Sequence, residues 1–175
     1  MRGGRLRGLV AQAAALAVVL AGCGYTFQGA QKALPGGATT IAIPMLANPT
    51  LEPELAVILT AAIRDQFART QAIRLVRTEA AEAILRGRVV GFSVDTIAFD
   101  SQGLALEYRA TLTLNLTLTD PDGGRIFWAD PAVRGTDTYR AASDPLVTEA
   151  NRREAVRRIA ADIGRSVRDR VLAGF

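Results

Sequence analysis

The sequence predicts an α/β fold, an α+β sandwich in which two helices pack on one face of a mixed four-stranded sheet, in the order β-α-β-β-β-α. The clearest observation is the regular alternation of leucine and threonine over residues 111–119, which is typical of a strand with one apolar and one polar face. Residues 51–70 and 145–172 instead repeat apolar side chains at helical spacing, which predicts two amphipathic helices.

The first half of the domain is expected to contain a strand, a helix and an optional short strand. Residues 39–46 form an apolar run that suits a buried strand, and the Asn-Pro-Thr turn at 48–50 leads into the helix of residues 51–70. Residues 72–76 could add a short strand. The order strand, helix, strand predicts a right-handed parallel crossover.

The second half is expected to contain three strands joined by tight turns and then the long helix. In the strand of residues 83–99, Gly87 and Gly91 indicate a bulge or a strong bend. The Asp-Pro-Asp-Gly-Gly sequence at 120–124 predicts a hairpin turn into a strand that reaches about Tyr139. Pro131 should interrupt or bend this strand, because proline has no N–H to donate.

The N-terminal residues show the pattern of a basic segment followed by an apolar run, which predicts an export signal. Three arginines precede the apolar run of residues 9–20, which is too short to span a bilayer. Leu-Ala-Gly at 20–22 stands directly before Cys23, the only cysteine, and this arrangement resembles the lipobox of bacterial lipoproteins. We therefore expect a signal peptide over 1–22, a lipid on Cys23, a tether over 23–38 and a single globular domain over 39–175. Gly24 is compatible with sorting to the outer membrane.

The composition argues against most catalytic machinery. The chain has no histidine and its single cysteine lies in the lipobox, which excludes Ser-His-Asp and Cys-His nucleophiles and zinc sites built from His and Cys. We expect no enzyme activity, no cofactor and no metal, and we interpret Asp120 and Asp122 as turn residues. Without the three signal arginines, 18 basic residues face 17 acidic ones, so nucleic acid is not an expected partner.

Two polar surfaces are candidates for binding. The threonine face, with Thr113 and Thr117, is either the exposed side of an antiparallel sheet or a partner surface. The arginines along the last helix could contact phosphate groups. They are better explained as a solvated helix face, because Glu154, Asp162 and Asp169 lie on the same helix.

A succession of short motifs resembles one known family. The lipobox continues into Cys-Gly-Tyr-Thr-Phe at 23–27, and the later matches are Leu-Pro-Gly-Gly at 34–37, the strand at 41–45, Asn-Pro-Thr at 48–50, Glu-Pro at 52–53, Ala-Ile-Leu-Arg-Gly at 83–87 and Glu-Tyr-Arg at 107–109. This order is similar to that of the LptE family, outer-membrane lipoproteins that assemble lipopolysaccharide.

The resemblance implies a function without catalysis. Members of the family plug the large β-barrel LptD, support its assembly and bind lipopolysaccharide. The implied location is the outer membrane, with a lipid anchor and the domain facing the periplasm or inside the barrel lumen. No family motif marks the lipopolysaccharide contacts, so the candidates are Arg109, Arg125 and Arg134, which lie on or beside the predicted strands, with Thr113 and Thr117 on the candidate partner surface.

Two other functions stay open on the sequence. One is a different periplasmic lipoprotein of similar fold, such as an activator of a peptidoglycan synthase or an accessory of an export complex. The other is a lipid-anchored hydrolase that uses carboxylates, as glycosidases do. The hydrolase is the less favoured, because no pair of carboxylates stands out in the sequence.

Overall fold

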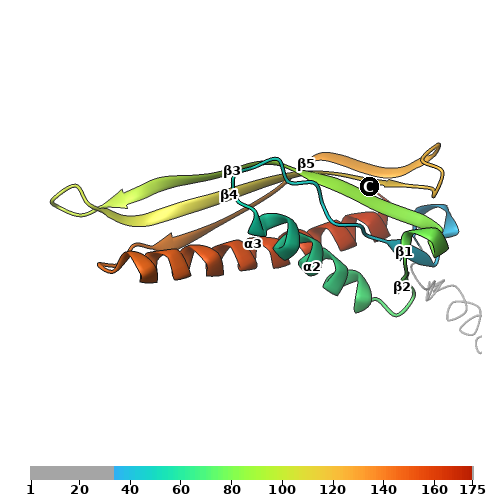
Figure 1. The fold of residues 1–175 in the computed structure, drawn as a ribbon, viewed down its shortest axis with the longest axis horizontal. Helices are drawn as coiled ribbons and strands as arrows, with labels where there is room; N and C mark the ends of the chain where they lie inside the picture. Colours follow the sequence, from blue (N-terminus) through green and yellow to red (C-terminus); the bar gives the residue numbers. More distant parts are fainter. Residues whose placement is uncertain (1–33, 175) are drawn as a thin grey trace, which may run out of the picture. The chain divides into compact units, whose positions relative to one another are not determined.

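A mixed sheet with helices on one face forms the part of the chain that the computed structural model describes, residues 34–174 (Figure 1). The strand order is β2-β1-β3-β4-β5. Cys23, the signal peptide and the first part of the predicted tether lie outside the described residues. The elements are η1 (Pro35–Gly37), β1 (Thr40–Ala42), α2 (Glu54–Ala68), β2 (Arg74–Leu75), η2 (Thr78–Ala80), β3 (Ala83–Phe99), β4 (Ala105–Thr119), β5 (Ile126–Arg140) and α3 (Pro145–Ala173).

The predicted fold class is confirmed, with one strand more than the four expected. β1 is parallel to both of its neighbours, β2 and β3, whereas β3, β4 and β5 form an antiparallel meander. The additional strand, β2, contains two residues of the segment where a short strand was considered. Two residues are too few for a sequence pattern, and their pairing with Thr40 and Ile41 becomes visible only in three dimensions.

The core lies between the sheet and the two helices. The four alternating leucines of β4, Leu112, Leu114, Leu116 and Leu118, are completely buried, as the alternation predicted, and they face the apolar stripes of α2 and α3. Two glycines allow α3 to lie close to the sheet and to α2. A Cβ at Gly135 would lie 2.7 Å from the side chain of Ile159, and a Cβ at Gly164 would lie 2.9 Å from the backbone oxygen of Ala62, where the helices meet.

Two bulges bend the long strands at the places where the sequence indicated irregularity. In β3 the register shifts between Val89 and Gly91, so that Val90 is inserted. In β5 it shifts between Asp130 and Val133, which places Pro131 in a bulge of an edge strand, where its missing N–H costs least. β5 therefore bends at Pro131 and continues.

The packed domain begins earlier than the expected residue 39. Leu34 is buried in the core, and Gly36 has a φ of 85° and lies against the ring of Phe127. A carboxylate fixes the chain that follows. Glu82 Oε2 accepts hydrogen bonds from the backbone N–H groups of Thr39, at 2.6 Å, and Thr40, at 3.1 Å, which attaches the start of β1 to the start of β3.

The Glu82 contact predicts a pH-dependent contribution to stability. The hydrogen bonds from Thr39 and Thr40 lower the pKa of Glu82 below its ordinary value of 4.5. The stabilisation is therefore present above pH 4.5 and is lost as the pH falls through the lowered pKa. We expect Glu82→Gln to lower the melting temperature at pH 7, and we expect its difference from the unchanged protein to shrink as the pH falls through the lowered pKa of Glu82. Equal melting temperatures at pH 7 would contradict this assignment.

Candidate functional site

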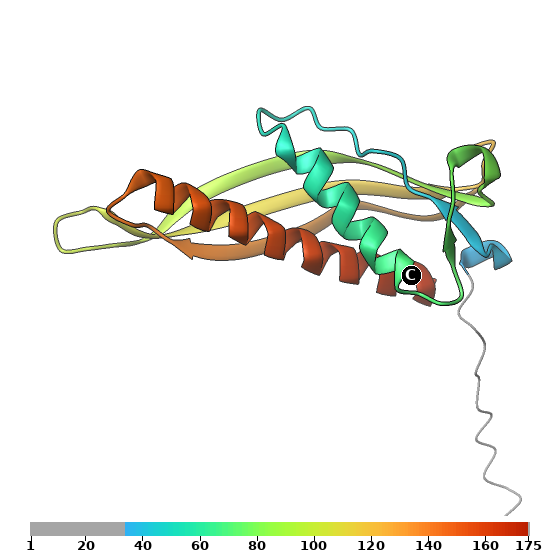
Figure 2. The ribbon, with the colours of Figure 1, turned by 60° about the horizontal axis from the view of Figure 1, so that its bottom comes forward.

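One face of the sheet is open to solvent, because α2 and α3 both pack on the other face (Figures 1 and 2). We call it the outer face. Along β4 it carries a row of small polar side chains, of which Thr113, Asn115 and Thr117 are half-buried and Thr111 is buried, and neither α2 nor α3 covers it. At the β1 end of the same face, Ile84 is buried against Ala42 and Ala81. The threonine face is thus the side of the sheet that lies away from α2 and α3, and it stays a candidate partner surface.

Three arginines from two different strands lie beside this row. Residues directly opposite each other in a sheet share a face, so the register places Arg86 of β3 beside Thr117, Arg88 of β3 beside Asn115 and Arg134 of β5 beside Thr113. We call Arg86, Arg88 and Arg134 the basic patch. All three side chains are exposed, and none of the paired positions between them is acidic.

The basic patch differs from the other arginine-rich surface of the domain in its lack of counter-charges. On α3, Arg157 pairs with Glu154, Arg158 with Asp137 and Arg165 with Asp162. Within the described chain, Arg88 and Arg134 form no hydrogen bond or ion pair, and Arg86 donates only to the hydroxyl of Thr119, at 3.0 Å. The positive charge of α3 is therefore neutralised locally, whereas that of the outer face is available to an anion.

A shallow hollow of about 330 Å³ lies next to Arg134. Its lining includes the hydroxyl side chains of Ser93, Thr111 and Thr113, together with the backbone of Gly91. A guanidinium group beside hydroxyl donors is suited to phosphate oxygens, because the guanidinium offers paired N–H donors and the hydroxyls can satisfy the remaining lone pairs. The chemistry that this arrangement supports is binding of a phosphorylated ligand.

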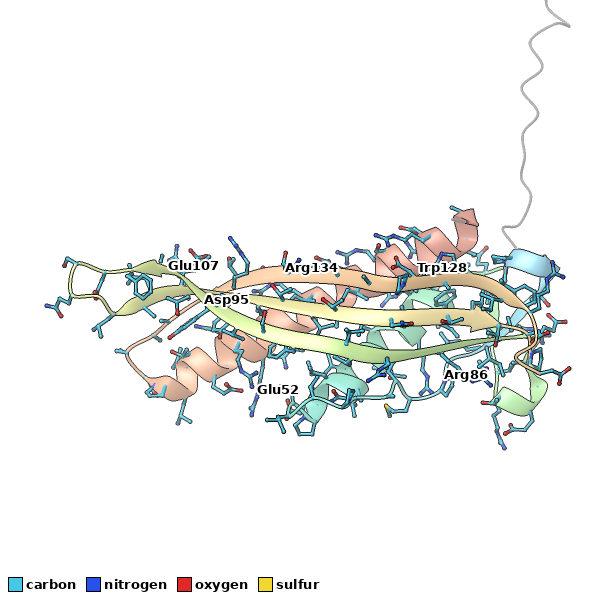
Figure 3. All side chains as sticks on the ribbon, turned by 90° about the horizontal axis from the view of Figure 1, so that it is seen from above. Glu52, Arg86, Asp95, Glu107, Trp128 and Arg134 are labelled. Carbon is cyan, nitrogen blue, oxygen red and sulfur yellow. The ribbon has the colours of Figure 1, made fainter. Side chains whose placement is uncertain are left out.

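The structure separates the three predicted arginines. Arg134 joins Thr113 and Thr117 on the outer face. Arg109 lies on the same face but opposite Asp95, and two residues from Glu107, so its surroundings are not net positive. Figure 3 shows Asp95 and Glu107 toward the β3–β4 turn and Arg86 toward the opposite end of the sheet. Arg125 lies in the β4–β5 turn, where its guanidinium stacks over Phe127 at 5.3 Å.

Sequence reasoning missed Arg86 and Arg88. The signal was present, because both alternate with the buried Leu85 and Val89 and so belong to the exposed side of β3. The sequence could not show which residues of β4 lie beside them, because the bulge at Val90 shifts the register between the two strands.

A second hollow, of about 600 Å³, lies between the β3–β4 turn and the start of α3. Its walls include Leu104, Leu106 and the stacked rings of Tyr108 and Tyr139, which lie 5.2 Å apart. The one cation on its wall, Arg152, already pairs with Glu149 and with Glu52 and thereby holds the loop before α2 against α3. This hollow offers an anion no free positive charge.

Two further properties concern the described residues. No cluster of three or more Cys, Asp or Glu side chains in residues 34–174 could hold a metal ion. Neither α2 nor α3 combines the length and the apolar composition that crossing a bilayer requires.

Comparison with known proteins identifies the family. The family model described as LptE, lipopolysaccharide-assembly, matches residues 38–171. No curated protein sequence matches the chain.

The fold is shared with solved lipoproteins. Lipoprotein B of Nitrosomonas europaea superposes with a TM-score of 0.58 at 15% identity, with 86% of this chain and 91% of that chain covered. A lipoprotein of Caulobacter crescentus gives a TM-score of 0.53 at 17% identity, with 75% and 88% covered. Rare lipoprotein B of Shewanella oneidensis gives a TM-score of 0.51 at 17% identity, with 77% of this chain and 91% of that chain covered. At these identities the likeness concerns the fold, and it is the family match that assigns the chain: the protein belongs to the LptE family of lipopolysaccharide-assembly proteins.

Proposed function

We propose that this protein is a lipid-anchored, non-catalytic subunit of the outer-membrane lipopolysaccharide translocon. In this function Cys23 carries the lipid, the domain plugs the β-barrel LptD and supports its assembly, and the basic patch binds phosphate groups of lipopolysaccharide. The observation that carries the ligand assignment is the contrast between the paired arginines of α3 and Arg88 and Arg134 on the outer face, which have no ion-pair partner among residues 34–174. Family membership supports the role in lipopolysaccharide assembly.

The location of the basic patch suits a large amphiphilic ligand better than a small metabolite. The hollow beside Arg134 is shallow and open, and it lies on the sheet face opposite α2 and α3, so that neither of these helices would obstruct a bulky headgroup. Lipopolysaccharide presents several phosphates on a wide headgroup, and arginines spaced across β3 and β5 can contact more than one of them.

The decisive experiment combines both parts of the proposal. The mature lipoprotein, produced together with LptD from the same organism, is extracted in mild detergent and purified. We expect the barrel to co-purify, and we expect the lipoprotein to bind lipopolysaccharide more tightly than the same lipopolysaccharide after enzymatic removal of its phosphates. Failure to recover the barrel would overturn the translocon assignment, and equal binding of the two ligands would overturn the phosphate assignment.

A further inference from the structure

On the side of β3 that faces away from β4, backbone pairing ends at the bulge at Val90. Up to Val89 the edge is covered, first by β1 and then by Ala47, which donates to the Gly87 carbonyl at 3.0 Å and accepts from the Val89 N–H at 2.8 Å. From residue 91 to residue 99, no strand within the described part of the chain pairs with this side of β3. We call residues 91–99 the free edge.

The pairing pattern identifies the groups that point outward. Before the bulge, Gly87 and Val89 direct their backbone polar groups away from β4, toward Ala47. The inserted Val90 changes this alternation by one residue, so Phe92, Val94 and Thr96 direct theirs outward along the free edge. An unpaired row of this kind is a template for another strand.

Apart from the register shifts on either side of Ala98 and the carboxylate of Asp95, the free edge lacks the features that normally prevent strand addition. Residues 91–99 contain no proline and no lysine or arginine, and Val94, Ile97 and Phe99 are 38%, 37% and 61% exposed. The opposite edge of the sheet, β5, carries a bulge with Pro131 and the charged Arg134, Asp137 and Arg140, which are typical protective features. Neither long edge has a pairing strand within residues 34–174, and of the two the edge of β3 is the less protected.

Charge indicates what kind of strand would fit. Residues 91–104, which form the free edge and the turn after it, contain two carboxylates, Asp95 and Asp100, and no basic residue. Arg109, which faces Asp95, lies one strand further in, on β4. This charge disfavours insertion among the phosphate-bearing lipids of a membrane surface and favours a polypeptide with basic side chains. The exposed apolar side chains of the free edge itself, Val94, Ile97 and Phe99, would pack against apolar residues of the same segment.

We propose that the free edge of β3 binds an extended segment of the partner barrel subunit by strand addition, and that this segment carries apolar and basic side chains. The proposal rests on the proposed function, because that function supplies the partner. Main-chain hydrogen bonds at Phe92, Val94 and Thr96 would provide affinity, and the carboxylates would select against acidic segments. The lipopolysaccharide contacts on the basic patch would stay accessible, because they lie on a face and not on this edge.

Hydrogen–deuterium exchange of the mature lipoprotein, alone and in its complex with the barrel, tests the proposal. We expect the amides of Phe92, Val94 and Thr96 to exchange about 100-fold more slowly in the complex. Slow exchange in the lipoprotein alone would mean that its own N-terminal segment or a second copy covers the edge, and would overturn the proposal. A complex in which these amides stay unprotected would overturn it as well and leave the proposed function intact, whereas failure to recover any barrel would count against the proposed function.

Val94→Pro and Val94→Ala form a matched pair for the same test. Both remove the valine side chain, but only proline removes the outward N–H, and an outward edge position tolerates proline because its N–H makes no bond to β4. With equal melting temperatures of the two lipoproteins, we expect Val94→Pro to reduce the recovered barrel at least about fivefold relative to Val94→Ala. Equal recovery would overturn the main-chain pairing.

Discussion

Replacing Gly87 by valine is expected to destabilise the domain by about 3 kcal/mol, which places it among the most damaging single substitutions in the sheet. A Cβ at this position would lie 2.2 Å from Leu116 Cδ2 and 2.9 Å from both the Asn115 carbonyl oxygen and Leu46 Cδ2. Leu116 and Leu46 are both buried, so neither side chain has free space into which it could move. The Asn115 oxygen belongs to the neighbouring strand, and its displacement would separate β3 from β4.

Gly91→Val is the matched control for Gly87→Val. Both glycines lie in β3, but no atom lies within 4 Å of a Cβ built at Gly91. We expect the free energy of unfolding to change by less than about 0.5 kcal/mol for this variant. Urea unfolding of the two variants and the unchanged protein measures the difference. A similar loss for both would mean that valine acts through the strand backbone, and the contacts of Gly87 would then not be the cause.

Removal of the basic patch by Arg86→Ala, Arg88→Ala and Arg134→Ala together is expected to weaken lipopolysaccharide binding about 100-fold, which corresponds to about 2.8 kcal/mol. Each arginine would lose a charge-assisted hydrogen bond to phosphate, weakened by its exposure to solvent. The affinity of the unchanged protein should fall with rising salt concentration, and that of the triple variant should depend on salt much less. Titration of lipopolysaccharide at two salt concentrations measures both effects.

The matched control removes three arginines from α3. Arg153, Arg157 and Arg165 are 53–56% exposed and are paired with carboxylates of α2 or α3, so their substitution by alanine lowers the net charge by the same amount. We expect an affinity within about twofold of that of the unchanged protein, because an exposed ion pair contributes little long-range field. An equal loss of affinity in the two triple variants would show that lipopolysaccharide binding depends on the net charge of the protein and not on the arginines of the outer face.

Periodic segments were the parts of the fold that the sequence could predict. β4 and α3 were recognised because one face of each is buried over many residues, so that the pattern repeats. The start of α2 was placed three residues early, since Asn48 and Thr50 form side-chain hydrogen bonds within the loop and delay the first helical residue to Glu54. The burial of Leu34 was not predictable, because it depends on contacts distant in the sequence.

The candidate site was predicted in part for the same reason. Thr113, Thr117 and Arg134 were identified because each lies on a strand whose polar side could be recognised. Arg109 was a weaker choice, since the neighbouring Asp95 comes from another strand and its proximity depends on the register. Arg125 was placed beside a strand, but a hairpin turn and the ring of Phe127 hold it apart from the basic patch.

The parallel pairing of β1 also determines the order in which the chain can fold. The meander of β3, β4 and β5 forms from hairpins whose strands follow one another directly, so its closure costs little entropy. β1 can join only after a loop of roughly 40 residues has closed, because Ile41 pairs with Ala83. The N-terminal strand, which follows the predicted tether, therefore docks late onto a preformed meander. A newly synthesised chain would thus pass through a stage in which the side of β3 later covered by β1 is transiently open.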